Sequence, residues 1–158
     1  MTYSSLFAYP GSEARGQPDE LTFLADWSDA DWGKLLQHTE ARRFRTGQEL
    51  IRGGEADRAL SIVVDGSLEV LGSNGRGRGT RRMALIDAGS VFGEIAFFDN
   101  KPRSATVRAV SDGRLLYLGF DAFEAFAAQE PELARDLLFN LGRILSVRLR
   151  QTSGFFTA

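Results

Sequence analysis

The chain has 158 residues, of which 43% are hydrophobic and 25% charged, and its net charge is −2, which predicts one globular domain with its own core. The absence of cysteine excludes disulfides and cysteine nucleophiles, and the slightly acidic balance argues against a dedicated nucleic-acid surface. No apolar run reaches membrane-spanning length and the N-terminus lacks the pattern of a signal peptide, so we expect a cytoplasmic protein.

Residues 1–27 contain proline and glycine breakers and are predicted to form an N-terminal arm, whereas residues 28–158 are predicted to form the globular domain. Ser28 is a favourable N-cap with acidic residues just after it, and apolar residues recur at helical spacing from Trp32 onward. We therefore expect a helix over residues 28–40.

Between residues 42 and 118 the apolar period changes to two, and glycines punctuate the pattern. Gly47 and Gly66 fall where tight turns need a positive φ. The regular spacing of turns predicts an antiparallel barrel or jelly roll rather than a parallel sheet. The expected fold class is α+β, with an antiparallel β-roll flanked by an N-terminal helix and C-terminal helices.

Residues 72–82, which are rich in glycine and arginine, separate two of the predicted strands. They do not match a P-loop, because no Gly-Lys-Ser/Thr sequence closes the segment and no helix follows it. We interpret the segment as a hairpin tip with solvated charges.

The most specific signal lies in residues 89–107. Residues 94–98 can form a helical turn, whose first N–H groups have no partner in the helix and carry positive partial charge. Gly93 allows a ligand to approach that backbone and Arg103 adds a guanidinium, so an anion site is expected. Glu94 adds a carboxylate that can accept a hydrogen bond from a ribose hydroxyl. A ligand that carries both an anionic group and such a hydroxyl is a nucleotide. The alternative is an ordinary turn–helix corner with a surface Arg–Glu pair.

Two C-terminal helices are predicted within residues 121–152, with Asp121 as the cap of the first and Pro131 at the start of the second. The apolar stripe of the second helix consists of Leu133, Leu137, Leu138, Leu141, Ile144, Leu145 and Leu149, and within this segment Leu138, Leu141, Leu145 and Arg148 fall at the spacing of a helix–helix seam. The helix is therefore expected to cover the barrel, to form a homodimer contact, or to do both.

A resemblance to a known family rests on two short motifs. Phe92-Gly93-Glu94-Ile95-Ala96, followed by Pro102-Arg103-Ser104-Ala105-Thr106-Val107, resembles the phosphate-binding cassette of cyclic nucleotide-binding domains, which occur in catabolite activator regulators, protein kinase A regulatory subunits and nucleotide-gated channels. The resemblance implies that Arg103 pairs with the cyclic phosphate, that Glu94 binds the ribose 2′-hydroxyl, and that N–H groups of the cassette complete the site. Those N–H groups belong to Gly93, Ile95 and Ala96.

The remaining site residues concern the sugar and the base. Apolar strand positions, Val70 and Met83, are expected to face both groups. The Arg-Ser-Ala sequence that includes Ser104 and Ala105 is similar to that of adenine-binding bacterial regulators, which implies cyclic AMP, with cyclic GMP as the alternative ligand. Candidate base contacts from the last helix are Arg148, Gln151 and Thr152.

Catalytic and metal-binding groups are not indicated. His38 is the only histidine, and it lies in the predicted first helix beside no nucleophile. One histidine without cysteine cannot supply the ligand cluster of a metal-dependent β-roll enzyme, and nothing indicates a serine triad. We therefore predict no catalytic residue, no metal site and no enzymatic activity.

We interpret the chain as a cyclic nucleotide sensor. Ligand binding would order the turn at residues 94–98, which would repack against the C-terminal helix and move it. We expect no membrane contact, and no direct DNA binding by this chain because no helix-turn-helix follows the last helix. The alternatives are the sensor half of a catabolite-activator-type regulator without its DNA-binding domain, and a degenerate module whose pocket holds the Phe155-Phe156 tail.

Overall fold

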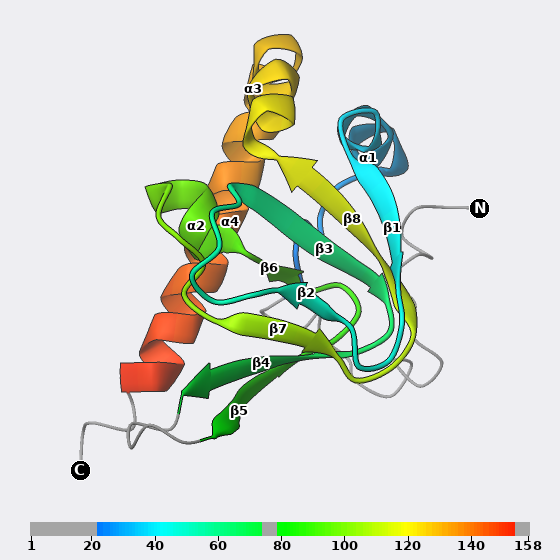
Figure 1. The fold of residues 1–158 in the computed structure, drawn as a ribbon. Coiled ribbons are helices and arrows are strands. Elements are labelled where there is room, and N and C mark those ends of the chain that lie inside the picture. The colour runs from blue at the N-terminus through cyan, green and yellow to red at the C-terminus, as the bar shows by residue number, and fades with distance from the viewer. Residues whose placement is uncertain (1–21, 74–78, 154–158) are drawn as a thin grey trace, which may run out of the picture.

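The computed structural model describes residues 22–73 and 79–153. The helices are α1 (Asp29–Leu36), α2 (Glu94–Asp99), α3 (Phe120–Gln129) and α4 (Pro131–Ser153). The strands are β1 (Glu40–Phe44), β2 (Glu49–Ile51), β3 (Ala59–Asp65), β4 (Leu68–Ser73), β5 (Thr80–Ile86), β6 (Val91–Phe92), β7 (Thr106–Ala109) and β8 (Gly113–Gly119). The strands form two antiparallel sheets, ordered β1-β8-β3-β6 and β2-β7-β4-β5, with helices at both ends of the chain path (Figure 1).

Strand β3 is central to the packing because both of its faces are buried. Leu60, Ile62 and Val64 face the layer of helices, whereas Val63 belongs to the apolar layer between the two sheets. The fold therefore has two cores that share one strand, one under the helices and one inside the roll.

Helix α1 begins as predicted but ends earlier. The Ser28 hydroxyl accepts a hydrogen bond from the Asp31 N–H, and the Asp31 carboxylate accepts one from the Ser28 N–H, which forms a capping box. The helix ends at Leu36 rather than near residue 40, because Glu40 already pairs with Tyr117 in the β1–β8 ladder. Strand pairing thus outweighs local helical propensity here.

The packed part of the domain begins before residue 28. Phe23 and Leu24 are fully buried, and the Leu24 N–H donates to Oδ1 of Asn140 on α4 at 3.0 Å. The boundary drawn at residue 28 is therefore too late, because two apolar residues of the predicted arm complete the core under the helices. The rest of that arm, residues 1–21, and the Phe155-Phe156 tail lie outside the described residues.

The predicted turns are present. Gly47 has φ +85° and Gly66 has φ +90°. A Cβ atom on Gly66 would lie 2.6 Å from the Asp112 carbonyl oxygen, so this turn needs glycine for both its conformation and its packing. Strands β4 and β5 pair as a hairpin, although its tip at residues 74–78 lies outside the described residues.

The two C-terminal helices differ from expectation in two details. Helix α3 starts at Phe120 with Gly119 as its N-cap, so Asp121 lies in the first turn and does not cap the helix. On α4, Leu141 is fully buried in the monomer core, whereas Leu138 and Leu149 are exposed. The predicted seam of Leu138, Leu141, Leu145 and Arg148 therefore combines residues from different faces of the helix. Among the described residues, no helix has both the length and the apolar character needed to cross a bilayer.

Candidate functional site

A cavity of about 530 Å³ opens between the sheet β2-β7-β4-β5, helix α2 and helix α4. The predicted site residues that line it are Val70, Met83, Gly93, Glu94, Ile95, Ala96, Arg103, Ser104, Ala105, Arg148 and Gln151. Thr152 was also predicted, but its side chain lies outside the described part of the chain. Residues from four strands or loops and two helices thus meet around one space.

Gly93 connects β6 to α2 in a left-handed conformation, with φ +84°. Its carbonyl oxygen accepts a hydrogen bond of 2.9 Å from Nη1 of Arg103, and a Cβ atom here would lie 2.6 Å from that nitrogen. As the N-cap of α2, Gly93 brings no side chain to bond the first N–H groups of the helix. A glycine is therefore required for the backbone conformation, for the approach of Arg103 and for access to those donors.

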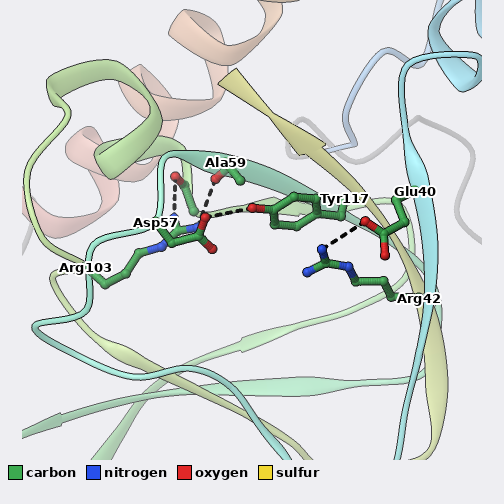
Figure 2. A network of polar contacts seen from close by, with 7 residues as sticks. Glu40, Arg42, Asp57, Ala59, Arg103 and Tyr117 are labelled. Atoms are coloured by element: carbon green, nitrogen blue, oxygen red, sulfur yellow. Dashed lines mark hydrogen bonds and ion pairs between the residues drawn. The ribbon is translucent and has the colours of Figure 1, made fainter. Parts of the chain in front are cut away.

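Arg103 carries a buried positive charge, because only 5% of the residue is exposed. Its Nη2 donates to Oδ2 of Asp57 at 3.1 Å and to the carbonyl oxygen of Ala59 at 3.2 Å (Figure 2). The Nε–H has no hydrogen-bond partner among the described residues. Since buried donors are normally satisfied, this guanidinium is held in place with hydrogen-bonding capacity left over.

Glu94 is buried as well, with 7% exposure. Its Oε1 accepts a 2.6 Å hydrogen bond from Nη1 of Arg148 on α4, and Nη2 of Arg148 donates to the Val91 carbonyl oxygen at 2.8 Å. Glu94 and Arg103 therefore have separate partners and are both buried, which excludes the surface Arg–Glu pair considered as the alternative. Arg148, which is predicted to contact the base, lines the cavity, and its guanidinium is hydrogen-bonded to the Glu94 carboxylate.

The strand side of the cavity is apolar. Strand β5 has an irregularity opposite β4, where Val70 pairs with Ala84 and Leu71 pairs with Arg82, so that Met83 has no paired residue. Met83 is 67% exposed, and a Cβ atom on Gly72 would collide with its sulfur. Because Gly72 has no side chain, it leaves the space that the Met83 side chain fills beside the cavity.

Two residues of the site were missed from the sequence. Asp57, in the loop between β2 and β3, pairs with Arg103, and Tyr117 on β8 donates its hydroxyl to Oδ1 of Asp57 at 2.7 Å. Asp57 lies 46 positions before Arg103 and Tyr117 lies 14 positions after it, and no local motif marks either of them. Only the pairing of β3 with β8 brings them beside Arg103.

His38 lies in the turn after α1 rather than within the helix, and its ring packs edge-on against Phe126 with the centroids 5.6 Å apart. Within residues 22–73 and 79–153, no group of three or more histidine, cysteine or acidic residues is placed to hold a metal ion.

The family model described as "Cyclic nucleotide-binding domain" matches residues 41–130. The chain belongs to the cyclic nucleotide-binding domain family. The match covers the roll, the cassette and α3, and it confirms both the recognition and the fold class expected from the sequence.

Relatives of this cyclic nucleotide-binding domain belong to larger proteins. It is 30% identical over 116 residues to the cyclic AMP receptor protein of Thermus thermophilus, covering 73% of this chain and 51% of that protein. It is 32% identical over 101 residues to a cyclic nucleotide-gated potassium channel of Mesorhizobium japonicum, covering 64% of this chain and 26% of the channel. The crystal structure of the Thermus thermophilus catabolite activator protein matches with a TM-score of 0.74 at 26% identity, covering 87% of this chain and 62% of that one. The chain spans about half of the receptor protein and about a quarter of the channel.

The conformation and the crowding at Gly93 give a direct test of the site geometry. Gly93→Ala should destabilise the domain by about 1–2 kcal/mol through left-handed strain and by a further 1–3 kcal/mol, roughly, through the clash with Arg103. Gly47→Ala is the matched control, because it has the same positive φ with no atom within 4 Å of the new Cβ. Urea unfolding measures both free energies, and equal losses would contradict the proposed crowding.

Proposed function

We propose that this domain binds cyclic AMP in the cavity between the roll and α4, and that it acts as a non-catalytic sensor whose output is a movement of α4. The observation that carries the proposal is the buried Arg103, which lines the cavity and retains an Nε–H without a partner. A buried charge is stabilised by an opposite charge that also bonds its free donors. The cyclic phosphate of the ligand supplies both.

The rest of the cassette suits the same ligand. The first N–H groups of α2 lack partners in the helix and face no capping side chain, so they add donors for the phosphate. Glu94 lies at the same cavity and offers a carboxylate to the ribose 2′-hydroxyl. The apolar wall that includes Val70 and Met83 offers a surface for the base, whose faces are poorly hydrated.

The preference for cyclic AMP over cyclic GMP is part of the proposal. It is supported by the Arg-Ser-Ala sequence at Arg103 and by the name of a relative, the cyclic AMP receptor protein of Thermus thermophilus. Gln151 is the described α4 residue at the cavity whose amide can both donate to and accept from an adenine edge.

The link from ligand to α4 runs through Glu94 and Phe97. Arg148 of α4 donates a hydrogen bond to the same Glu94 carboxylate that would accept one from the ribose hydroxyl, so ligand binding changes the contacts of Arg148. Phe97 of α2 packs edge-on against Phe120 and Phe123 at the start of α3, with ring centroids 5.5 and 5.3 Å apart. A shift of α2 on binding is therefore transmitted to α3 and α4, which are themselves packed together.

Such a sensor can act in either of two protein contexts. As a stand-alone sensor it works in the cytoplasm, which a chain without cysteine suits, and contacts neither membrane nor DNA directly. As the sensor half of a catabolite-activator-type regulator it would move a DNA-binding domain instead. A degenerate module that binds no nucleotide is disfavoured because the buried charges of Arg103 and Glu94 are retained.

Arg103→Ala should abolish tight binding of cyclic AMP, because the buried phosphate loses its partner. Removing one member of a buried pair costs about 3–5 kcal/mol, which is roughly a hundred- to several-thousandfold in affinity. Calorimetry of the purified domain with cyclic AMP measures the loss. Arg114→Ala is the control, since Arg114 pairs with Asp65 away from the cavity, and it should bind like the wild type. Equal binding by Arg103→Ala would overturn the site.

Competition binding should rank cyclic AMP above cyclic GMP by roughly tenfold or less, because one discriminating hydrogen bond contributes about 0.5–1.5 kcal/mol net. A tighter complex with cyclic GMP would contradict the preference. In that case Ser104→Ala would show whether the Ser104 hydroxyl recognises the guanine amino group.

Arg148→Ala should loosen the end of α4 in the ligand-free protein. Hydrogen bonds between charged groups contribute about 1.5–3 kcal/mol, so amide exchange over residues 145–151 should accelerate roughly tenfold or more. Arg150→Ala is the matched control, because Arg150 is exposed on the same helix. If both variants exchange like the wild type, the Arg148–Glu94 contact does not hold α4.

A homodimer contact through α4 is also proposed, with its residues corrected by the structure. Leu138, Gly142, Leu145 and Leu149 recur at spacings of three and four, and Leu138 and Leu149 are exposed while Gly142 has open space beside it. Sedimentation should show a dimer that Leu138→Glu with Leu149→Glu converts to a monomer. Val110→Glu, at an exposed turn elsewhere, should leave the dimer intact. A wild-type monomer at high concentration would exclude the contact.

A further inference from the structure

A tyrosine outside the cassette is connected to Arg103 through a shared carboxylate. Oδ1 of Asp57 accepts a 2.7 Å hydrogen bond from the Tyr117 hydroxyl, and Oδ2 of the same group accepts one of 3.1 Å from Nη2 of Arg103. Figure 2 shows the three side chains in line, with the Tyr117 hydroxyl pointing toward Asp57. Each carboxylate oxygen therefore has its own partner.

The Tyr117 ring is itself held from the other side. The guanidinium of Arg42 lies over the ring, 3.6 Å from its centroid, and Arg42 pairs with Glu40 at 3.0 Å (Figure 2). Burial and the hydrogen bond to Asp57 both raise the pKa of Tyr117, so the hydroxyl stays protonated and remains a donor well above neutral pH. The contact to Asp57 is thus available throughout the physiological range.

Asp57 needs such a restraint. It lies in the loop between β2 and β3 and its side chain is 40% exposed, whereas the Arg103 side chain that it meets is almost fully buried. A half-exposed carboxylate on a loop can rotate toward solvent unless a second bond fixes it. Tyr117, which projects from a central strand of the sheet, supplies that bond from a rigid support.

We propose that Tyr117 is a positioning residue for Arg103 and acts through Asp57. Its hydroxyl fixes the rotamer of the Asp57 carboxylate and draws part of the carboxylate charge toward itself. The first effect orients the Arg103 guanidinium, and the second leaves more of its charge for a phosphate. This inference rests on the proposed binding of a cyclic nucleotide at Arg103. It adds a residue that sets the orientation of the Arg103 guanidinium before the phosphate binds.

The test compares cyclic AMP binding by calorimetry for the wild type, Tyr117→Phe, Asp57→Ala and the double variant. Phenylalanine keeps the ring under Arg42 and removes only the hydroxyl. Thr46→Val is the matched control, because the Thr46 hydroxyl also donates to a carboxylate, that of Asp112, at a turn away from the cavity. The Nε–H resonance of Arg103 in ¹⁵N NMR reports the guanidinium directly, and thermal unfolding reports the fold.

Tyr117→Phe should weaken cyclic AMP binding roughly three- to tenfold, should move the Arg103 Nε–H resonance, and should leave the unfolding midpoint close to that of Thr46→Val. In the Asp57→Ala background the same change should alter affinity less than about 1.5-fold, because the path to Arg103 is already cut. Unchanged binding by Tyr117→Phe, or an equal loss in both backgrounds, would overturn the inference alone. A wild type that binds no cyclic nucleotide would overturn the proposed function and this inference together.

Discussion

The structure depends on keeping a positive charge, that of Arg103, where water hardly reaches. Its three partner groups come from two separate segments: the Gly93 carbonyl before α2, and the Asp57 carboxylate and Ala59 carbonyl where the loop after β2 enters β3. The desolvation cost of such a charge is offset only when these groups converge. The roll, the loop and the cassette therefore have to fold together for the site to exist.

The shared strand β3 connects the layer that contains the cavity to the layer of helices. One of its faces packs in the core of the roll, beside the cavity, and the other packs under the helices. Helix α2 is inserted at the boundary of these layers, with Phe97 in the helical core and Glu94 at the cavity. A six-residue helix thus contacts both the cavity and the core under the helices.

Local features were predictable from the sequence, and non-local ones were not. The helical turn that follows Gly93, the positive-φ glycines at Gly47 and Gly66, and the Ser28 cap each depend on a few adjacent residues, and all are present in the structure. The early end of α1 is decided by strand pairing with Tyr117, and the partners of Arg103 and Glu94 are decided by contacts across 46 and 54 positions. Leu141 faces the core because of how α4 meets the sheet, which an apolar stripe alone does not specify.

The irregular pairing at Met83 has a consequence for solubility. Strand β5 is at the edge of its sheet and carries two exposed apolar side chains, Met83 and Leu85. A regular β5 would therefore present a row of unpaired backbone N–H and C=O groups beside an exposed hydrophobic surface. The break in register interrupts that row, and charged Arg81 and Arg82 precede it. The feature that shapes one wall of the cavity thereby also hinders sheets of two molecules from joining edge to edge and aggregating.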